Sequence, residues 1–294
     1  MADQALLRLQ RGEFVLDLYP QKGGAIAAWR KSNRALLRPA SKAFLQRSDP
    51  RSAACFPLVP FSNRIADGRF RFRGRTYQLA RNFPPEPHAI HGYGWQNPWV
   101  VADAGASRAE LIFRHAVRGT PLDYRARQIL ALRDDGLEIA LEVTNAGDGA
   151  MPAGIGLHPY FIRTDGVTLR ASLDHVWLPD EHNIPKRRVP LPATWDFARG
   201  LRLAPLDLDH CFGGWDGRAE LHWPETDLTL LIEATPPLRH LVVYVPPGQD
   251  FFCMEPVSHV NDGFNLLERG VEGTGVRVLA PGETLGATVR LRVV

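Results

Sequence analysis

The chain has few of the residues that mark disulfide-stabilised or zinc-binding proteins. Its 294 residues include only three cysteines, Cys55, Cys211 and Cys253, which stand far apart, and no Cys-x-x-Cys pair occurs. An odd number of distant cysteines indicates neither a disulfide framework nor a zinc ribbon. This usage fits a reducing compartment, so we expect a cytoplasmic protein in which Cys211 and Cys253 pack as small apolar residues.

Long apolar runs and a strong excess of one charge are also missing. No apolar stretch approaches the roughly 18 residues of a membrane span, and the N-terminus lacks a basic segment followed by an apolar one. The 35 basic and 32 acidic side chains give a formal charge of +3, too small to draw the whole protein to nucleic acid. We therefore expect neither a membrane nor a nucleic acid as a partner.

Signatures of covalent and nucleotide chemistry are absent as well. No Gly-x-Ser-x-Gly elbow, phosphate loop or Gly-x-Gly-x-x-Gly fingerprint lies between a predicted strand and a predicted helix. These absences argue against an acyl-enzyme and against a nucleotide-dependent enzyme.

The sequence is rich in alternation with a period of two residues. Apolar side chains occupy every second position from Leu137 to Val143 and from Leu285 to Val293, which is typical of half-buried antiparallel strands. Asp134-Asp135-Gly136 and Gly74 each separate two strand-like runs, and both stretches predict hairpins. Further strands are predicted at residues 14–19, 99–102, 110–114, 167–173, 219–223, 228–233 and 241–245.

Glycine and proline are scattered along the chain and do not cluster. The 26 Gly and 24 Pro are typical of many short strands joined by turns, and no linker, repeat or shift of composition divides the sequence. Helical turns are predicted only near residues 40–45 and 263–268. We predict an all-β protein, a large antiparallel β-sandwich that forms one domain over residues 1–294.

Two histidines form an H-x-x-H pair in a loop-like stretch. His88 and His91 lie within Pro-His-Ala-Ile-His-Gly-Tyr-Gly-Trp, where the glycines and prolines disfavour a helix. The zinc motif H-E-x-x-H needs one helical turn between its histidines and a Glu that is missing here. A metal site is therefore the least favoured role, and a loop histidine bonded to backbone and a substrate contact both stay open.

A second histidine and a glutamate each stand before a proline among apolar neighbours. His158 precedes Pro159 and two aromatic residues, and Glu255 ends the apolar run Phe-Phe-Cys-Met. A residue before proline favours extended backbone. Glu255 therefore either points outward from a strand or is partly buried with a task. A buried carboxylate near an imidazole would supply an acid and a base near neutral pH.

Five segments follow one another in a particular order between residues 55 and 267. They are Ser62-Asn63-Arg64-Ile65 with Gly68, Phe70, Phe72, Gly74, Tyr77 and Leu79; His91-Gly92; His158-Pro159-Tyr160-Phe161; Leu208-Asp209-His210-Cys211-Phe212; and Glu255-Pro256 with Asn265. Each segment by itself is common, but the ordered set is specific. Together they resemble the aldose 1-epimerase (galactose mutarotase) family.

This resemblance implies a β-sandwich of the galactose mutarotase type that interconverts the α and β anomers of a free sugar without a metal or cofactor. It implies that His158 is the general acid and Glu255 the general base, and we expect the two on opposite sides of the hemiacetal. Three residues would hold sugar hydroxyls, Arg64, His91 and Asp209, and Asn63 is a further candidate for substrate binding. A small sugar is the expected partner, and the oligomeric state stays open.

One departure from the family leaves the preferred sugar open. Many members have a longer Gly-rich segment after the first His-Gly, whereas here Gly92 is followed by Tyr-Gly-Trp. Trp95, Trp215 and Trp223 are candidates for stacking on the sugar, although we expect at least two of them in the core.

Three alternative functions stay open at this point. A mutarotase acting on hexose 6-phosphates would need a basic cluster at the mouth of its pocket. A carbohydrate-binding β-sandwich without turnover would need no special role for Glu255. A metal-dependent cupin would need a His-x-His pair that the sequence lacks.

Overall fold

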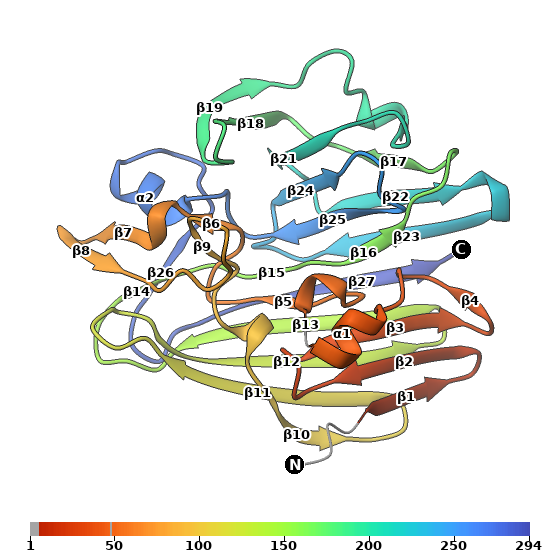
Figure 1. The fold of residues 1–294 in the computed structure, drawn as a ribbon, viewed down its shortest axis with the longest axis horizontal. Helices are drawn as coiled ribbons and strands as arrows, with labels where there is room; N and C mark the ends of the chain where they lie inside the picture. The colour runs from red at the N-terminus through yellow and green to blue at the C-terminus, as the bar shows by residue number, and fades with distance from the viewer. Residues whose placement is uncertain (1–5, 48) are drawn as a thin grey trace.

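Strands dominate the computed structural model, which describes residues 6–47 and 49–294. Within these residues the strands form three larger sheets and three two-stranded ribbons, accompanied by two short helices, α1 (Lys42–Arg47) and α2 (Gly263–Glu268) (Figure 1). The predicted all-β fold is confirmed. Helix α2 coincides with the predicted turn at 263–268, and α1 begins at Lys42, two residues after the start of the predicted turn at 40–45.

The largest sheet has nine strands and contains both of the strongly alternating segments. Residues Gly136–Asn145 pair with Thr284–Val293 in antiparallel register, so their apolar positions share one face. The predicted hairpin at Asp134-Asp135 joins two of its longest strands. In spatial order the sheet consists of β10 (Val100–Ala104), β11 (Arg108–Ala116), β12 (Asp123–Arg133), β13 (Gly136–Asn145), β27 (Thr284–Val293), β23 (Leu228–Ala234), β22 (Arg218–Trp223), β17 (Thr168–Ala171) and β20 (Leu201–Arg202).

The second sheet has eight strands and carries most of the segments that resemble the family. In order they are β19 (Pro185–Pro190), β18 (His175–Pro179), β21 (Leu208–Gly213), β24 (His240–Val245), β25 (Phe251–Val257), β15 (Gly156–Leu157) and β5 (Pro57–Leu58), with β16 (Tyr160–Ile162) also paired to β25. Sequence periodicity identified only β24 among these, because most of the others are short or contain proline.

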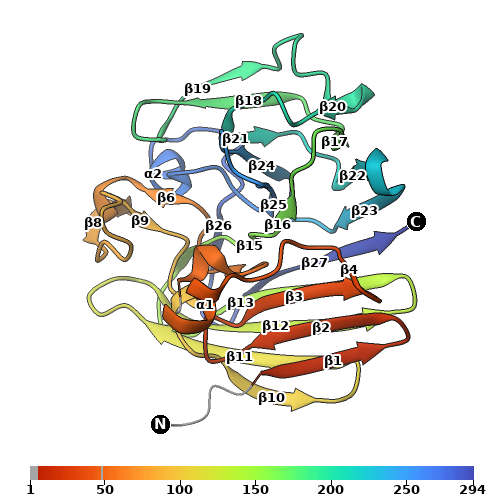
Figure 2. The ribbon, with the colours of Figure 1, turned by 45° about the vertical axis from the view of Figure 1, so that its right-hand side comes forward.

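The remaining strands form a four-stranded sheet and three ribbons. The sheet consists of β1 (Leu7–Arg11), β2 (Phe14–Tyr19), β3 (Ala25–Lys31) and β4 (Arg34–Ala35). The ribbons pair β14 (Met151–Ala153) with β26 (Arg277–Leu279), β6 (Arg64–Ile65) with β9 (Ala89–Ile90), and β7 (Arg69–Phe72) with β8 (Arg75–Gln78). The last pair is the hairpin predicted at Gly74. In both views α2 lies near β6 (Figures 1 and 2), and it also contacts β7.

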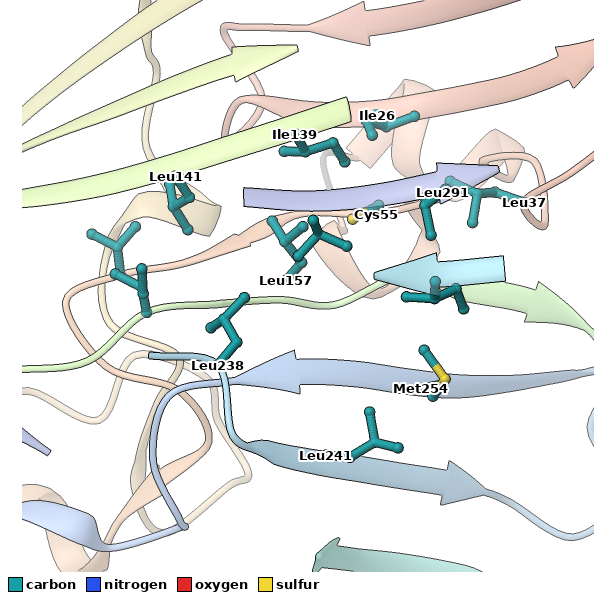
Figure 3. Close-up of a cluster of buried hydrophobic side chains, with 14 of the residues drawn as sticks. Ile26, Leu37, Cys55, Ile139, Leu141, Leu157, Leu238, Leu241, Met254 and Leu291 are labelled. Carbon is teal, nitrogen blue, oxygen red and sulfur yellow. The ribbon is translucent and has the colours of Figure 1, made fainter. Parts of the chain in front are cut away.

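The main core lies between the sheets. Figure 3 shows Ile139, Leu141 and Leu291 of the nine-stranded sheet facing Leu241 and Met254 of the eight-stranded sheet. These residues belong to one buried apolar cluster that extends from Leu9 to Leu291. Burial of this surface, at about 25 cal/mol per Å², is the main stabilising contribution to the fold.

The opposite face of the eight-stranded sheet is covered by loops and holds a second apolar cluster. Alternation along β25 sends Phe252 and Met254 into the main core and Cys253 and Val257 into this second cluster. Glu255 is two residues beyond Cys253 on the same strand, so its side chain points to the same, loop-covered face. Among the described residues, no helix has the length and the apolar character needed to cross a membrane.

Candidate active site

A cavity of about 220 Å³ opens on the loop-covered face of the eight-stranded sheet. All six residues predicted as a site line it, although the first and the last of them are 192 positions apart in the sequence. They are Asn63, Arg64, His91, His158, Asp209 and Glu255. The structure therefore brings the whole predicted set together in one pocket.

Strand register places the acidic residues of this pocket. Glu255 on β25 lies opposite Val242 on β24, and Asp209 on β21 lies opposite Tyr244 on the same β24. Residues directly opposite each other in antiparallel strands share a face. Two carboxylates and a phenol consequently point to the same side of the sheet, and Glu255, only 2% exposed, is deepest. This burial rules out the outward-pointing position that the sequence left open for Glu255.

His158 lies directly beside Glu255. Its backbone N–H donates to the Phe56 carbonyl at 3.0 Å, between strands β15 and β16, and its ring stacks on Tyr160 with 4.7 Å between ring centroids. His158 Nε2 is 3.3 Å from Glu255 Oε1. The expectation that the two groups stand on opposite sides of a hemiacetal is therefore wrong, because no sugar ring fits between them.

Burial sets the protonation of this pair. It lowers the pKa of the His158 imidazole, and it raises the pKa of the Glu255 carboxyl well above its ordinary value. The Asp209 charge also raises the Glu255 pKa, while Arg64 opposes it. Each charged form is disfavoured in so apolar a site. Both shifts act in the same direction, favouring a neutral imidazole beside a protonated carboxyl.

His91 is held as a neutral hydrogen-bond donor. Its Nδ1 accepts the backbone N–H of Asn63 at 3.0 Å, so Nε2 carries the ring proton. Burial lowers the pKa of His91 well below its usual range, and the neighbouring His158 and Arg64 lower it further. The imidazole therefore presents one N–H donor beside the pocket.

Gly92 allows the chain to turn tightly after His91. Its φ is +67°, and a Cβ at this position would lie only 2.1 Å from the Val59 carbonyl oxygen and 2.5 Å from the carbonyl carbon. Only glycine fits this conformation without displacing backbone. The His-Gly pair thus fixes the direction in which the imidazole enters the pocket.

Arg64 is clamped by three neighbours. Its Nε donates to Glu86 Oε2 at 3.4 Å, and its Nη1 lies 3.9 Å from Asp209 Oδ2. The Asn63 side-chain oxygen accepts from the Arg64 backbone N–H at 2.9 Å and from Nη1 at 3.1 Å. Asn63 therefore orients the Arg64 guanidinium through these two hydrogen bonds.

The sequence did not single out several other residues that line the cavity. Glu86 is a carboxylate in a proline-rich loop, and its position two residues before the H-x-x-H pair was the available signal. Phe56, Phe83 and Tyr244 also line the wall, and Arg51 lies at the rim. They come from loops and from a strand whose contact with the pocket depends on tertiary packing.

His88 does not share the pocket with His91. Its Nδ1 accepts the backbone N–H of Asp67 at 2.9 Å, and its Nε2 lies 3.2 Å from the His182 carbonyl oxygen. Both ring nitrogens are thus used in joining loops. The sequence left open whether the histidines of the H-x-x-H pair bond to backbone or contact a substrate. His88 is bonded to backbone.

The three tryptophans proposed for stacking divide as expected. Trp215 and Trp223 belong to the main core. Trp95, in the 3₁₀ turn Gly94–Gln96, lines the cavity, stacks on Phe56 with 5.2 Å between centroids and donates from Nε1 to the Gly92 carbonyl. The Tyr-Gly-Trp segment therefore supplies an aromatic wall.

Comparison with known proteins agrees with this geometry. A model of the family described as aldose 1-epimerase matches residues 5–292. The curated protein YphB of Escherichia coli K12, described as uncharacterized, is 33% identical over 293 residues, which is 97% of each chain. A crystal structure from the same organism is also 33% identical, with a TM-score of 0.90 and 99% of both chains covered.

A more distant solved structure shares the fold. It is a galactose mutarotase-like protein from Clostridium acetobutylicum that is 20% identical, with a TM-score of 0.87, covering 100% of this chain and 96% of the other. The β-sandwich of the galactose mutarotase type is thereby confirmed. Together with the family match over nearly the whole sequence, these relations show that the chain belongs to the aldose 1-epimerase family.

Proposed function

We propose that this protein is a mutarotase that interconverts the α and β anomers of a free aldose. The observation that carries the proposal is the buried His158 and Glu255 pair, 3.3 Å apart in a pocket of polar side chains. Family membership indicates an isomerase, and this pair supplies both proton-transfer groups that the reaction needs.

Ring opening moves two protons at adjacent oxygens. Glu255 as carboxylate takes the proton of the C1 hydroxyl, and the O–H electron pair becomes the second bond of the C1 carbonyl. The bond between C1 and the ring oxygen breaks, and the ring oxygen receives a proton from the His158 imidazolium. Both oxygens are bonded to C1, so an acid and a base side by side suit the reaction better than a pair on opposite sides.

The products of opening are the reagents of closure. After opening, Glu255 is protonated and His158 is neutral, which is the state that burial favours. Rotation about the C1–C2 bond then presents the other face of the carbonyl. His158 takes the proton from the attacking hydroxyl, while Glu255 returns one to O1. One shared proton thus serves both directions, and the enzyme ends each cycle unchanged.

The remaining polar groups would bind the sugar. Arg64 offers N–H donors, Asp209 offers acceptors, and the Nε2–H of the neutral His91 adds one more donor. Trp95 and Phe56 supply an apolar surface for the C–H face of a sugar. These contacts orient C1 over the proton-transfer pair.

The charges of the pocket favour a neutral sugar over a phosphorylated one. Two cationic side chains line it, and both have carboxylate partners. Arg64 lies between Glu86 and Asp209, and Arg51 at the rim pairs with Asp49 at 3.2 Å. A phosphate dianion would have to displace these carboxylates. The basic cluster expected of a hexose 6-phosphate mutarotase is not found among the described lining residues.

Saturation-exchange NMR between anomers tests the proposal. Glucose, galactose, arabinose and glucose 6-phosphate would each be measured with and without protein, at ionic strengths from about 0.05 to 0.5 M. We expect faster exchange for a neutral aldose, with kcat/KM nearly independent of salt. Preference for glucose 6-phosphate with a steep fall in salt would overturn the substrate class. Sugar binding without faster exchange would indicate a binding protein instead.

A further inference from the structure

The three cysteines of this chain converge on one carboxylate. Cys55, Cys211 and Cys253 are far apart in sequence, yet all three are buried, free thiols close enough to Glu255 for its charge to raise their pKa further, after the larger effect of burial. Cys253 is placed differently from the other two. Its Sγ, a carboxylate oxygen of Glu255 and a ring nitrogen of His158 all lie within 4.8 Å of one another.

Local geometry holds these three side chains in place. Cys253 and Glu255 are two residues apart on β25, so they share a face of the strand. Tyr160 of the neighbouring β16 pairs with Cys253, which brings His158 alongside. A tetrahedral zinc ion, with bonds of about 2.0–2.3 Å, needs its ligand atoms about 3.3–3.6 Å apart. The His158 and Glu255 atoms already meet this spacing at 3.3 Å, and Sγ, within 4.8 Å of its partners, would have to move closer when a metal ion binds.

Two polar atoms of the cluster have no hydrogen-bond partner. Glu255 Oε2 and His158 Nδ1 are both buried without one, which is costly in an apolar site. The unpartnered oxygen belongs to the same carboxylate that lies beside His158 Nε2. A cation there would satisfy it.

The charges of the ligands suit a divalent ion. One thiolate, one carboxylate and one neutral imidazole balance a charge of +2, so the complex is neutral and its burial avoids the cost of an isolated charge. Cysteine sulfur and imidazole nitrogen are the donors that Zn²⁺ and Cd²⁺ prefer over Mg²⁺ or Ca²⁺. His158 and Glu255 also line the cavity, which provides the path of entry.

We propose that His158, Cys253 and Glu255 form a binding site for a thiophilic divalent cation, and that the bound ion blocks anomer exchange. The ion occupies the lone pairs that proton transfer uses, and binding expels the thiol proton together with the proton of the acid–base pair. Three protein ligands leave a fourth position open toward the pocket for water. The ion is an inhibitor here and not a cofactor. Inhibition rests on the proposed function, whereas binding does not.

Cobalt provides a spectroscopic test that is independent of activity. Co²⁺ bound to a thiolate shows a near-ultraviolet charge-transfer band, so it would be titrated into wild-type protein, Cys253→Ala and Cys211→Ala. Cys211 is the matched control, because it is also a buried thiol near Glu255 but lies outside the ligand cluster. We expect the band in wild type and in Cys211→Ala, and its loss in Cys253→Ala. Absence of the band in wild type, or its persistence in Cys253→Ala, would refute the site.

Measuring anomer exchange in the presence of zinc tests the second part of the proposal, that the bound ion inhibits the reaction. Zn²⁺ should inhibit competitively with the sugar, and the concentration for half inhibition should rise at least about tenfold in Cys253→Ala but not in Cys211→Ala. Metal-free Cys253→Ala should exchange anomers at close to the wild-type rate, which also shows that it is folded. A cobalt band without anomer exchange on any sugar would refute the proposed mutarotase function but would still support the cation-binding site. Anomer exchange that continues unchanged in the presence of zinc would refute the proposal that the bound ion inhibits the reaction.

Discussion

Glu255→Gln is the most direct perturbation of the proposed mechanism. Glutamine keeps the shape and volume of the side chain, so the 2% exposed site stays filled, but the amide cannot take a proton from the C1 hydroxyl. The other lining carboxylates cannot replace it, because Glu86 and Asp209 are both engaged with Arg64. The variant therefore removes the base and leaves the acid and the sugar-binding groups.

The size of the effect follows from the role assigned to Glu255. A positioned general base contributes about 10² to 10⁴ in rate, or about 3 to 5 kcal/mol of transition-state stabilisation. We expect kcat for anomer exchange to fall at least about a hundredfold, while KM changes little because Arg64, His91 and Asp209 are untouched. Glu86→Gln is the matched control, since it alters a lining carboxylate that clamps Arg64, and it should raise KM more than it lowers kcat.

Stability measurements separate a catalytic defect from unfolding. Because burial raises the pKa of Glu255 above its unfolded value, this group stabilises the fold fully only below the unfolded pKa and loses that contribution as the pH rises through the folded pKa. Glutamine does not titrate, so the variant should unfold at neutral pH at an equal or higher urea concentration. A folded Glu255→Gln that exchanges anomers within threefold of wild type would refute the assignment of Glu255 as base.

Three further predictions follow from the same structure. His158→Asn should lower kcat about a hundredfold or more with a smaller change in KM; an effect on KM alone would make His158 a binding residue. Exchange activity should survive dialysis against a chelator, because side chains carry both protons; loss that zinc or manganese restores would reopen the role of His88 and His91 as metal ligands. Burial lowers the pKa of His240 and His259 to about 4, so both resist protonation in the fold and the free energy of unfolding should fall as pH drops from about 6.5 toward 4. Each contributes up to about 1.4 kcal/mol per pH unit, and urea unfolding of His259→Gln should show a correspondingly shallower pH profile; an unchanged profile would contradict this account.

The sequence by itself determined the class of fold and identified six of the residues that line the pocket. Alternation with a period of two in β13 and β27 reflects local geometry, because successive side chains of a strand point to opposite faces. The turn at Asp134-Asp135 is likewise a local property of the chain. The ordered motifs named His158, Glu255 and the residues around them without any knowledge of distance.

Only the tertiary structure decided how those residues act. His158 and Glu255 are 97 positions apart, and their contact depends on the pairing of β16 with β25, which no local pattern specifies. The same holds for β18, β19 and β21, whose short or proline-containing segments become strands through their neighbours. Protonation is also a tertiary property, because the burial that shifts the pKa values of His158 and Glu255 comes from distant segments folded over them.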